Sequence, residues 1–452
     1  MPSITEVVKG NRPDLTSYEE LYKWFHTHPE LSFQEKKTAE AIVKHLETFK
    51  VYTIHSCIGG HGVAASFSNG PGKTVLLRAD IDALPVEEQT GLAYASTARM
   101  KDLDGVEKPV MHACGHDMHI TALLAAAECL VKCKDQWSGE LILVFQPAEE
   151  RAGGAQNMVD DGLYKLVKEP DVVIGAHVMP ERAGVIGTKH GLIASSSDRF
   201  QCVQNRFYSL SKLNPPTPTC KLINQHANRL RILGRQAHAS TPHRGIDPIL
   251  QAASTIMRLQ SIVSREVDPL DFAVVTVSAF HAGDAENIIP SEANLKIDVR
   301  AALPSTRDRV LASVKRIIAS EASASNNPNV PTLTPTTQFP LLFNDTDVTA
   351  RLEESFSRHF PPGRQGYQND IARLQGSEDF GILATAIGKP SCFFLYGGTE
   401  HEVWDRAERE DRLNEDVPGN HSPFFAPVVQ PTLTVGMEGY VVAALTFLGK
   451  EG

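Results

Sequence analysis

Eight consecutive residues, 112–119, carry more metal-ligand side chains than most folds can place in one stretch. They spell His-Ala-Cys-Gly-His-Asp-Met-His and supply three imidazoles, one thiol and one carboxylate. Imidazole together with thiolate suits zinc and neighbouring transition metals rather than calcium or magnesium. The Ala- and Leu-rich run at 120–133 predicts a helix. The pattern therefore predicts a metal-binding loop at a helix N-terminus, where the helix dipole should favour the thiolate of Cys114.

Further ligand types stand where predicted strands end. Three apolar runs separated by helical segments are predicted strands: 73–77, 140–146 and 171–176. Asp80 follows the first run, Glu149 and Glu150 follow the second, and His177 follows the third. Because the carboxyl ends of parallel strands meet at one edge of a sheet, these side chains should share a site with the His/Cys loop.

Length and charge limit the class of protein. At 452 residues, two domains are the natural expectation. The formal net charge of −10, with 54 acidic against 44 basic residues, argues against a nucleic-acid partner. We expect no membrane span, because no apolar run of that length is evident, and no signal-peptide core. Seven irregularly spaced cysteines favour a reduced, cytoplasmic setting.

Nine short motifs, in order along the chain, identify a resemblance. They are HTHPELS (26–32), RADIDALPVEE (78–88), MHACGHDMH (111–119), QPAEE (146–150), GAHV (175–178), AHASTPH (237–243), ENIIP (286–290), GSEDF (376–380) and HSPFF (421–425). The chain resembles the M20-type metallopeptidases, specifically the amidohydrolase branch with hippurate hydrolases and auxin-conjugate hydrolases. The ordered set is specific and covers nearly the whole chain.

The resemblance implies a site with two divalent metal ions. Cys114 would bridge them, in the place where related peptidases use an aspartate. His116 and His177 would complete one metal site, and Glu150 with His421 the other. Zinc or manganese is expected, although cobalt or nickel also suits this ligand set. Spacing alone does not choose among the three histidines of residues 112–119.

The resemblance also assigns roles beside the metals. Glu149 would be the general base that takes a proton from a metal-activated water and returns it to the leaving amine. Asp80 and Asp117 are candidates for orienting the ligand imidazoles.

The chain divides by pattern into a catalytic α/β domain and an insertion. The resemblance implies a dinuclear-metal aminopeptidase-like domain built from residues 1–191 and 341–452, with an inserted α+β, ferredoxin-like domain at 192–340. Residues 229–339 show a β-α-β-β-α-β order, which predicts a small four-stranded sheet with helices on one side. In the family this insertion is a lid and dimerisation domain, so a homodimer is expected.

Three residues of the insertion match family positions that reach the substrate. His238 would act in the partner subunit's active site and steady the oxyanion, although Arg235 and Gln236 replace the usual small residues before it. Asn287 and Arg300 would bind the substrate carboxylate, for which an arginine fork is well suited. A surface charge at a strand end is the other interpretation of Arg300.

Residues 203–228 interrupt a strand that the family pattern makes continuous. This segment is rich in Pro, Asn and Ser, and its apolar residues follow neither the helical nor the strand periodicity. It is interpreted either as a retained intron in the gene model or as a surface loop.

The function expected from these motifs is metal-dependent hydrolysis of N-acyl-amino acids, which are small-molecule substrates. A metallo-dipeptidase or carboxypeptidase is the closest alternative. A cysteine hydrolase using Cys114 as nucleophile is a second alternative. A metal-bound scaffold without catalysis is disfavoured, because Glu149 is present.

Overall fold

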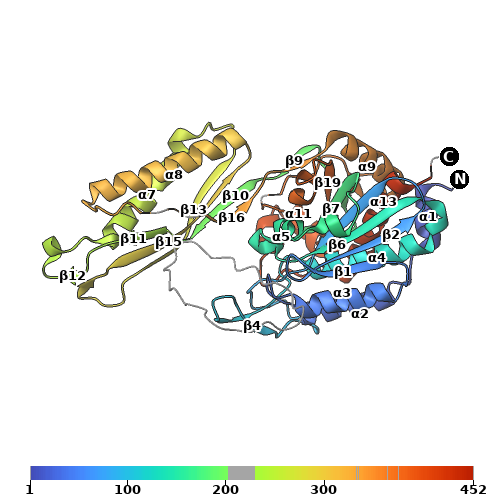
Figure 1. Ribbon diagram of the computed structural model, residues 1–452, viewed down its shortest axis with the longest axis horizontal. Coiled ribbons are helices and arrows are strands. Elements are labelled where there is room, and N and C mark those ends of the chain that lie inside the picture. The colour runs from blue at the N-terminus through green and yellow to red at the C-terminus, as the bar shows by residue number, and fades with distance from the viewer. Residues whose placement is uncertain are drawn as a thin grey trace.

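The computed structural model describes residues 2–201, 230–331, 333, 335–363, 365–374 and 376–450. Two principal sheets organise these residues, and each has its own helices (Figure 1). The interruption predicted at 203–228 lies outside the described residues, so neither interpretation of it is tested.

The larger sheet has eight strands, and the four in its middle run parallel. In spatial order they are β1 (Thr53–Ile58), β2 (Gly62–Asn69), β6 (Gly139–Gln146), β3 (Thr74–Asp80), β7 (Val172–Arg182), β19 (Ser391–Thr399), β8 (Ile186–Gly187) and β18 (Tyr367–Gln368). Every residue of β3 is buried, and its apolar part, Val75 to Leu77, has no polar alternation because both faces of the strand are covered. The three predicted strands are confirmed, but β7 continues to Arg182, so His177 lies within a strand rather than after one.

Hydrophobic cores cover both faces of the larger sheet. Val75 and Leu77 of β3 belong to one core, and Leu76 between them belongs to the other. The first core contains α4 (His116–Lys132) and α13 (Val429–Leu448), which pack against each other. The predicted helix at 120–133 is α4, which begins four residues earlier, at His116.

Helix α13 is long and apolar enough, by length and composition alone, to cross a membrane. The sequence expectation that no segment has this length is therefore wrong. Its most apolar window is 83% buried, because α4, α1 (Ile4–Asn11) and α9 (Thr346–His359) pack around it. Its apolar composition is that of a core helix.

The smaller sheet has four strand positions, and one of them is shared by two segments. Its members are β13 (Ala273–Ala282), β15 (Glu292–Ala301), β10 (Ser196–Gln201), β11 (Leu230–Leu233) and β16 (Pro335–Phe339). β13 pairs with one edge of β15, while β10 and β11 follow one another along its other edge. Helices α7 (Pro248–Glu266) and α8 (Pro304–Ala324) pack together on one side of this sheet, as Figure 1 shows.

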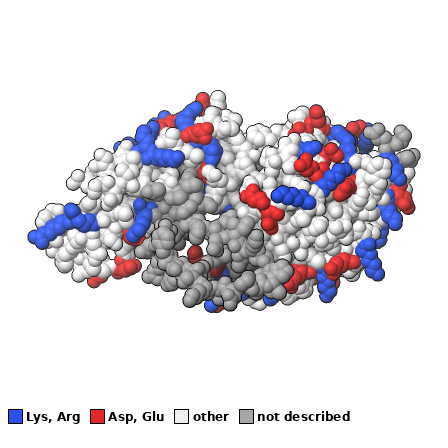
Figure 2. All heavy atoms as spheres, viewed as in Figure 1, with Lys and Arg blue, Asp and Glu red and all other residues white. Residues whose placement is uncertain are grey.

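This β-α-β-β-α-β unit matches the predicted order of elements. Its core, which includes Ile232, Leu259, Ile297 and Val314, is separate from the cores of the larger sheet. Charged side chains of both signs are interspersed over the face of the molecule drawn in Figure 2.

Candidate metal centre

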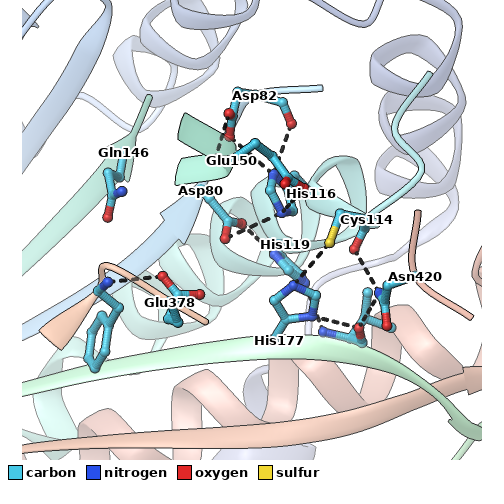
Figure 3. Close-up of polar contacts among 12 residues, drawn as sticks. Asp80, Asp82, Cys114, His116, His119, Gln146, Glu150, His177, Glu378 and Asn420 are labelled. Atoms are coloured by element: carbon cyan, nitrogen blue, oxygen red, sulfur yellow. Dashed lines mark hydrogen bonds and ion pairs between the residues drawn. The ribbon is translucent and has the colours of Figure 1, made fainter. Parts of the chain in front are cut away.

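Two groups of potential ligand atoms share Cys114. The thiol lies with His116 and His177 in one group and with Glu150 and His421 in the other, and within each group the ligand atoms lie within 4.8 Å of one another. Cys114 Sγ is 3.4 Å from His177 Nε2, and His421 Nε2 is 3.1 Å from Glu150 Oε1. The structure thus brings together the five residues that the resemblance implied, in the same two groups. Figure 3 shows four of them: Cys114, His116, Glu150 and His177.

A glycine turn delivers Cys114 and His116 to the site. Gly115 caps α4 with a φ of 81°, a left-handed conformation that side chains rarely adopt. A Cβ at Gly115 would lie 2.4 Å from Val178 Cγ1. The loop can therefore pack against β7 only with glycine at this position, and this packing places the thiol beside His177.

Glu149 and Glu150 sit on a turn with an unusual backbone. Ala148 and Ala152, which flank a single 3-10 turn, have φ values of 49° and 47°. Each such non-glycine residue costs on the order of 1–3 kcal/mol and is typical of functional sites. The Glu150 amide donates to Asp82 Oδ2 at 3.1 Å, which ties the turn to the end of β3. The two adjacent carboxylates are thereby held in fixed directions.

The loop before α13 brings His421 to the cluster. The backbone amide of His421 donates to the Ala113 carbonyl at 2.7 Å, and the φ angle of His421 is 70°. Asn420 Nδ2 donates to the carbonyls of Cys114 and Val178, both at 3.3 Å. Sequence reasoning missed Asn420, and only its place beside a proposed ligand could have indicated its role.

Backbone carbonyls fix the orientation of the two buried imidazoles. His116 Nδ1 donates to the Asp82 carbonyl at 2.8 Å, and His177 Nδ1 donates to the Val178 carbonyl at 2.6 Å. Each ring therefore presents its Nε2 lone pair to the cluster. His116 Nε2 is buried and has no hydrogen-bond partner among the described residues, and Glu150 Oε1 is buried with His421 Nε2 3.1 Å away. A buried imidazole nitrogen without a partner, beside a carboxylate and a thiol, fits a pair of divalent cations.

The structure also distinguishes the role of His116 from that of His119. His119 Nδ1 is 2.5 Å from Asp80 Oδ1, and its Nε2 accepts from the Val178 amide at 2.8 Å. Because both nitrogens are engaged, His119 has no lone pair left for a cation. His112 lies in neither group, and burial lowers its pKa to about 4.

The predicted role is wrong for Asp117, whereas Asp80 contacts one candidate ligand, with its Oδ2 3.6 Å from His116 Nε2. Asp80 hydrogen-bonds His119, and Asp117 Oδ2 is 2.6 Å from His26 Nδ1. Neither carboxylate hydrogen-bonds a candidate ligand, because backbone carbonyls already occupy the Nδ1 atoms of His116 and His177.

The expected dipole effect on Cys114 is also wrong. Burial raises the pKa of the Cys114 thiol well above its ordinary value, and the charges of Glu150 and Glu149 raise it further. These effects outweigh the dipole of α4, so the thiolate needs a cation beside it. This disfavours a mechanism in which Cys114 alone is the nucleophile.

Glu149 adjoins a buried acidic group that sequence reasoning left without a role. Its carboxylate lies within 4.8 Å of those of Glu378 and Asp379, from the GSEDF motif. Burial raises the pKa of Glu149 well above its usual value, and the charge of Glu378 adds to this. Arg78, which is fully buried, donates to Glu378 at 2.9 Å and to Asp80 at 2.8 Å. The positive charge of Arg78 thus partly balances the carboxylates that lie next to Glu149.

The three residues of the smaller unit are not at this cluster. His238, on β12 (Ala237–His238), is exposed, and the Asn287 carbonyl accepts from the Ala239 amide at 2.9 Å. Both residues lie at the tip of the unit, at the end of the molecule opposite the larger sheet (Figure 1). Arg300 lies on β15, with its Nε 2.9 Å from Asp298 Oδ2. One chain therefore does not bring His238 and Asn287 to the ligands.

A mixed sheet with two adjoining ligand groups at its strand ends is the architecture of the dinuclear-metal hydrolases. Residues 76–416 match the model of peptidase family M20/M25/M40, so the chain belongs to that family. Hippurate hydrolase of Campylobacter jejuni is 33% identical, over 86% of this chain and 89% of that protein. IAA-amino acid hydrolase ILR1-like 5 of Arabidopsis thaliana is 30% identical, over 92% and 85%.

A solved structure supports the same class. The YXEP protein of Bacillus subtilis, a dinuclear metal binding peptidase from the M20 family, superposes with a TM-score of 0.67. It is 26% identical, and the match covers 97% of this chain and 99% of that one. The chain is accordingly a metal-dependent amide hydrolase.

Proposed function

We propose that the protein hydrolyses the amide bond of N-acyl-amino acids. Cys114, His116, Glu150, His177 and His421 would hold two divalent metal ions, with zinc or manganese as the expected metals. The observation that carries the proposal is the sharing of Cys114 by two ligand groups, with Glu149 beside them. The names of the relatives, which include a hippurate hydrolase and an N-acyl-L-amino acid amidohydrolase, support this substrate class.

Glu149 is the general base in this proposal. When bound, the two cations supply Lewis-acid polarisation of the amide carbonyl and lower the pKa of water. Glu149 would take the proton at its carboxylate and pass it to the leaving amine. Its pKa, raised by burial and by Glu378, suits a group that must hold a proton between these two transfers.

A homodimer through the smaller unit would supply the remaining residues. His238 and Asn287 lie side by side at an exposed tip, remote from the ligands of their own chain. The partner's copy of this tip would reach the site, where His238 could steady the oxyanion and Asn287 the substrate carboxylate. Arg300 would need to exchange its contact with Asp298 for the substrate, so its role is the least direct of the three.

One experiment separates these proposals from the alternatives. The purified protein would be analysed for bound metal and tested on N-acyl-amino acids beside matched dipeptides. Cleavage of acylated amino acids by the metal-loaded protein supports the proposal. Preference for dipeptides would favour the peptidase alternative, and activity that survives complete metal removal would favour Cys114 as nucleophile.

A further inference from the structure

A cavity of about 210 Å³ lies beside the candidate metal centre. Glu150 contributes both to its wall and to one of the two ligand groups. Ser32, also in the wall, donates to Asp82 Oδ2 at 2.7 Å, the same oxygen that accepts from the Glu150 amide. A substrate held at the ligands could therefore place one of its ends in this cavity.

Half of the residues that line the cavity are apolar. Leu31 and Ala83 form one side; they are bridged to each other, and they belong with Val110 to a small hydrophobic cluster. Leu84 extends this side, and Leu103 faces the cavity from the turn between β4 (Arg99–Lys101) and β5 (Glu107–Pro109). Leu103 is 50% exposed, so its side chain is open to contact by a bound molecule.

The wall offers one buried donor without a partner among the described residues, Gln34 Nε2, but no buried cation for a substrate carboxylate. Asp102 and Glu150 are both acidic, and an exposed arginine, Arg151, is the one basic residue among those lining the cavity. Asp102 Oδ1 already accepts from the amides of Asp104 and Val106 at 3.0 and 2.9 Å. A buried carboxylate would need matched cationic partners, whereas an uncharged apolar group needs none.

The volume indicates the size of the group. An aliphatic cavity of roughly 150 Å³ can hold a benzene ring. The 210 Å³ here is enough for a ring with a short linker and far more than an acetyl group fills.

We propose that this cavity receives the acyl group of the substrate and that Leu103 sets which acyl groups are accepted, with benzoyl- and phenylacetyl-sized groups preferred over acetyl. This inference rests on the proposed function, because it requires that N-acyl-amino acids are the substrates. It names the acyl class and the residue that selects it.

The test compares N-acetyl, N-benzoyl and N-phenylacetyl derivatives of one amino acid with the metal-loaded full-length protein. Leu103→Trp should fill the cavity and lower kcat/KM for the aromatic acyl groups at least about tenfold relative to acetyl. Leu103→Ala should shift the preference towards larger groups. Leu84→Trp should fill the cavity from the opposite wall. This second variant keeps the test decisive if the tryptophan at position 103 points into solvent.

Val106→Trp is the matched control. Val106 lies on the same turn and is also 50% exposed, but it does not line the cavity. Its substitution should leave the ratio of acyl preferences unchanged. An unchanged ratio in the active Leu103 and Leu84 variants would overturn the inference, as would a change confined to amino-acid preference. If the wild-type protein cleaves no N-acyl-amino acid, the proposed function fails first and the inference falls with it.

Discussion

Gln201 and Leu230 occupy consecutive positions along the same edge of β15. Gln201 pairs with Lys296, and Leu230 pairs with the preceding residue, Leu295. β10 and β11 therefore complete one strand position, although 28 residues separate them in the sequence (202–229). Residues 202–229 themselves lie outside the described part of the chain.

Deletion of residues 202–229 should leave a folded, active protein. Joining Gln201 to Leu230 preserves both pairings, and closing a connection of that length costs on the order of 3 kcal/mol. We expect an unchanged or higher Tm and unchanged turnover, measured by calorimetry and amide hydrolysis.

Deletion of residues 202–228 is the control. It leaves one extra residue, and a one-residue slip turns alternate side chains to the wrong face of the sheet. This variant should be less stable than the first. Loss of folding or activity in the 202–229 deletion would show that the segment has a role of its own.

Glu149→Gln should keep its metal and lose its turnover. An amide has nearly the shape of the carboxylate but cannot accept the proton, and loss of a general base costs ~10²–10⁴ in rate. Metal content and kcat would be measured on the same preparation. Glu140→Gln, a carboxylate on the preceding strand, should behave as wild type. A Glu149→Gln enzyme with more than about a tenth of normal turnover would exclude Glu149 as the base.

Substitutions of Cys114 separate the metal mechanism from thiol catalysis. Cys114→Asp should retain appreciable activity, because a carboxylate can bridge two cations. Cys114→Ser should lose most of its metal, since a neutral hydroxyl is a poor ligand. If both variants are inactive while their metal content stays normal, Cys114 acts as more than a ligand.

His26 should make stability depend on pH. Its Nδ1 lies 2.6 Å from Asp117 and its Nε2 lies 3.0 Å from Glu88. Although burial opposes the charge, these carboxylates raise the pKa of His26 to about 10, from about 6.5 in the unfolded chain. A raised pKa stabilises the fold fully below pH ~6.5, and this contribution is lost as pH rises towards ~10.

Unfolding of the wild type and of His26→Gln, followed in denaturant between pH 6 and pH 9, measures this effect. The difference in unfolding free energy should be largest at pH 6 and should shrink as the pH rises. A difference that is the same at every pH would mean that His26 is buried uncharged.

Hybrid dimers test the partner's contribution. His238→Ala and Glu149→Gln chains should each be nearly inactive alone. A mixed dimer contains one site with both groups intact, so it should recover part of the activity. Verified heterodimers without recovery would show that each site is complete within one chain or that His238 is only structural.

The sequence pattern predicted those parts of the site that depend on local order. The Glu149–Glu150 pair could be predicted because an acidic pair directly ends an apolar strand, and α4 because few helix breakers follow His119. The tautomers of the ligand histidines could not be predicted from the sequence. They depend on which carbonyl faces each Nδ1 atom, and only the fold places Asp82 beside His116.

Long-range packing explains the other omissions. Glu378 reaches Arg78 across 300 residues of sequence, so its motif gave no sign of its partner. The pKa of Cys114 depends on burial and on carboxylates from two separate segments, Glu149 with Glu150 and Asp80, and the dipole of its own helix is the weaker effect. The cavity beside Glu150 combines four segments that are distant in the sequence, and one of them, with Asp102 and Leu103, lies outside every motif of the resemblance.

The central claim is that two cations, held by ligand groups that share Cys114, are required for amide hydrolysis. Metal content of the purified protein, measured by mass spectrometry together with activity before chelation, after chelation and after metal is restored, tests it most directly. We predict two divalent ions per chain, loss of hydrolysis on their removal, and recovery when zinc or manganese is returned. Full activity in protein shown to be metal-free would contradict the account.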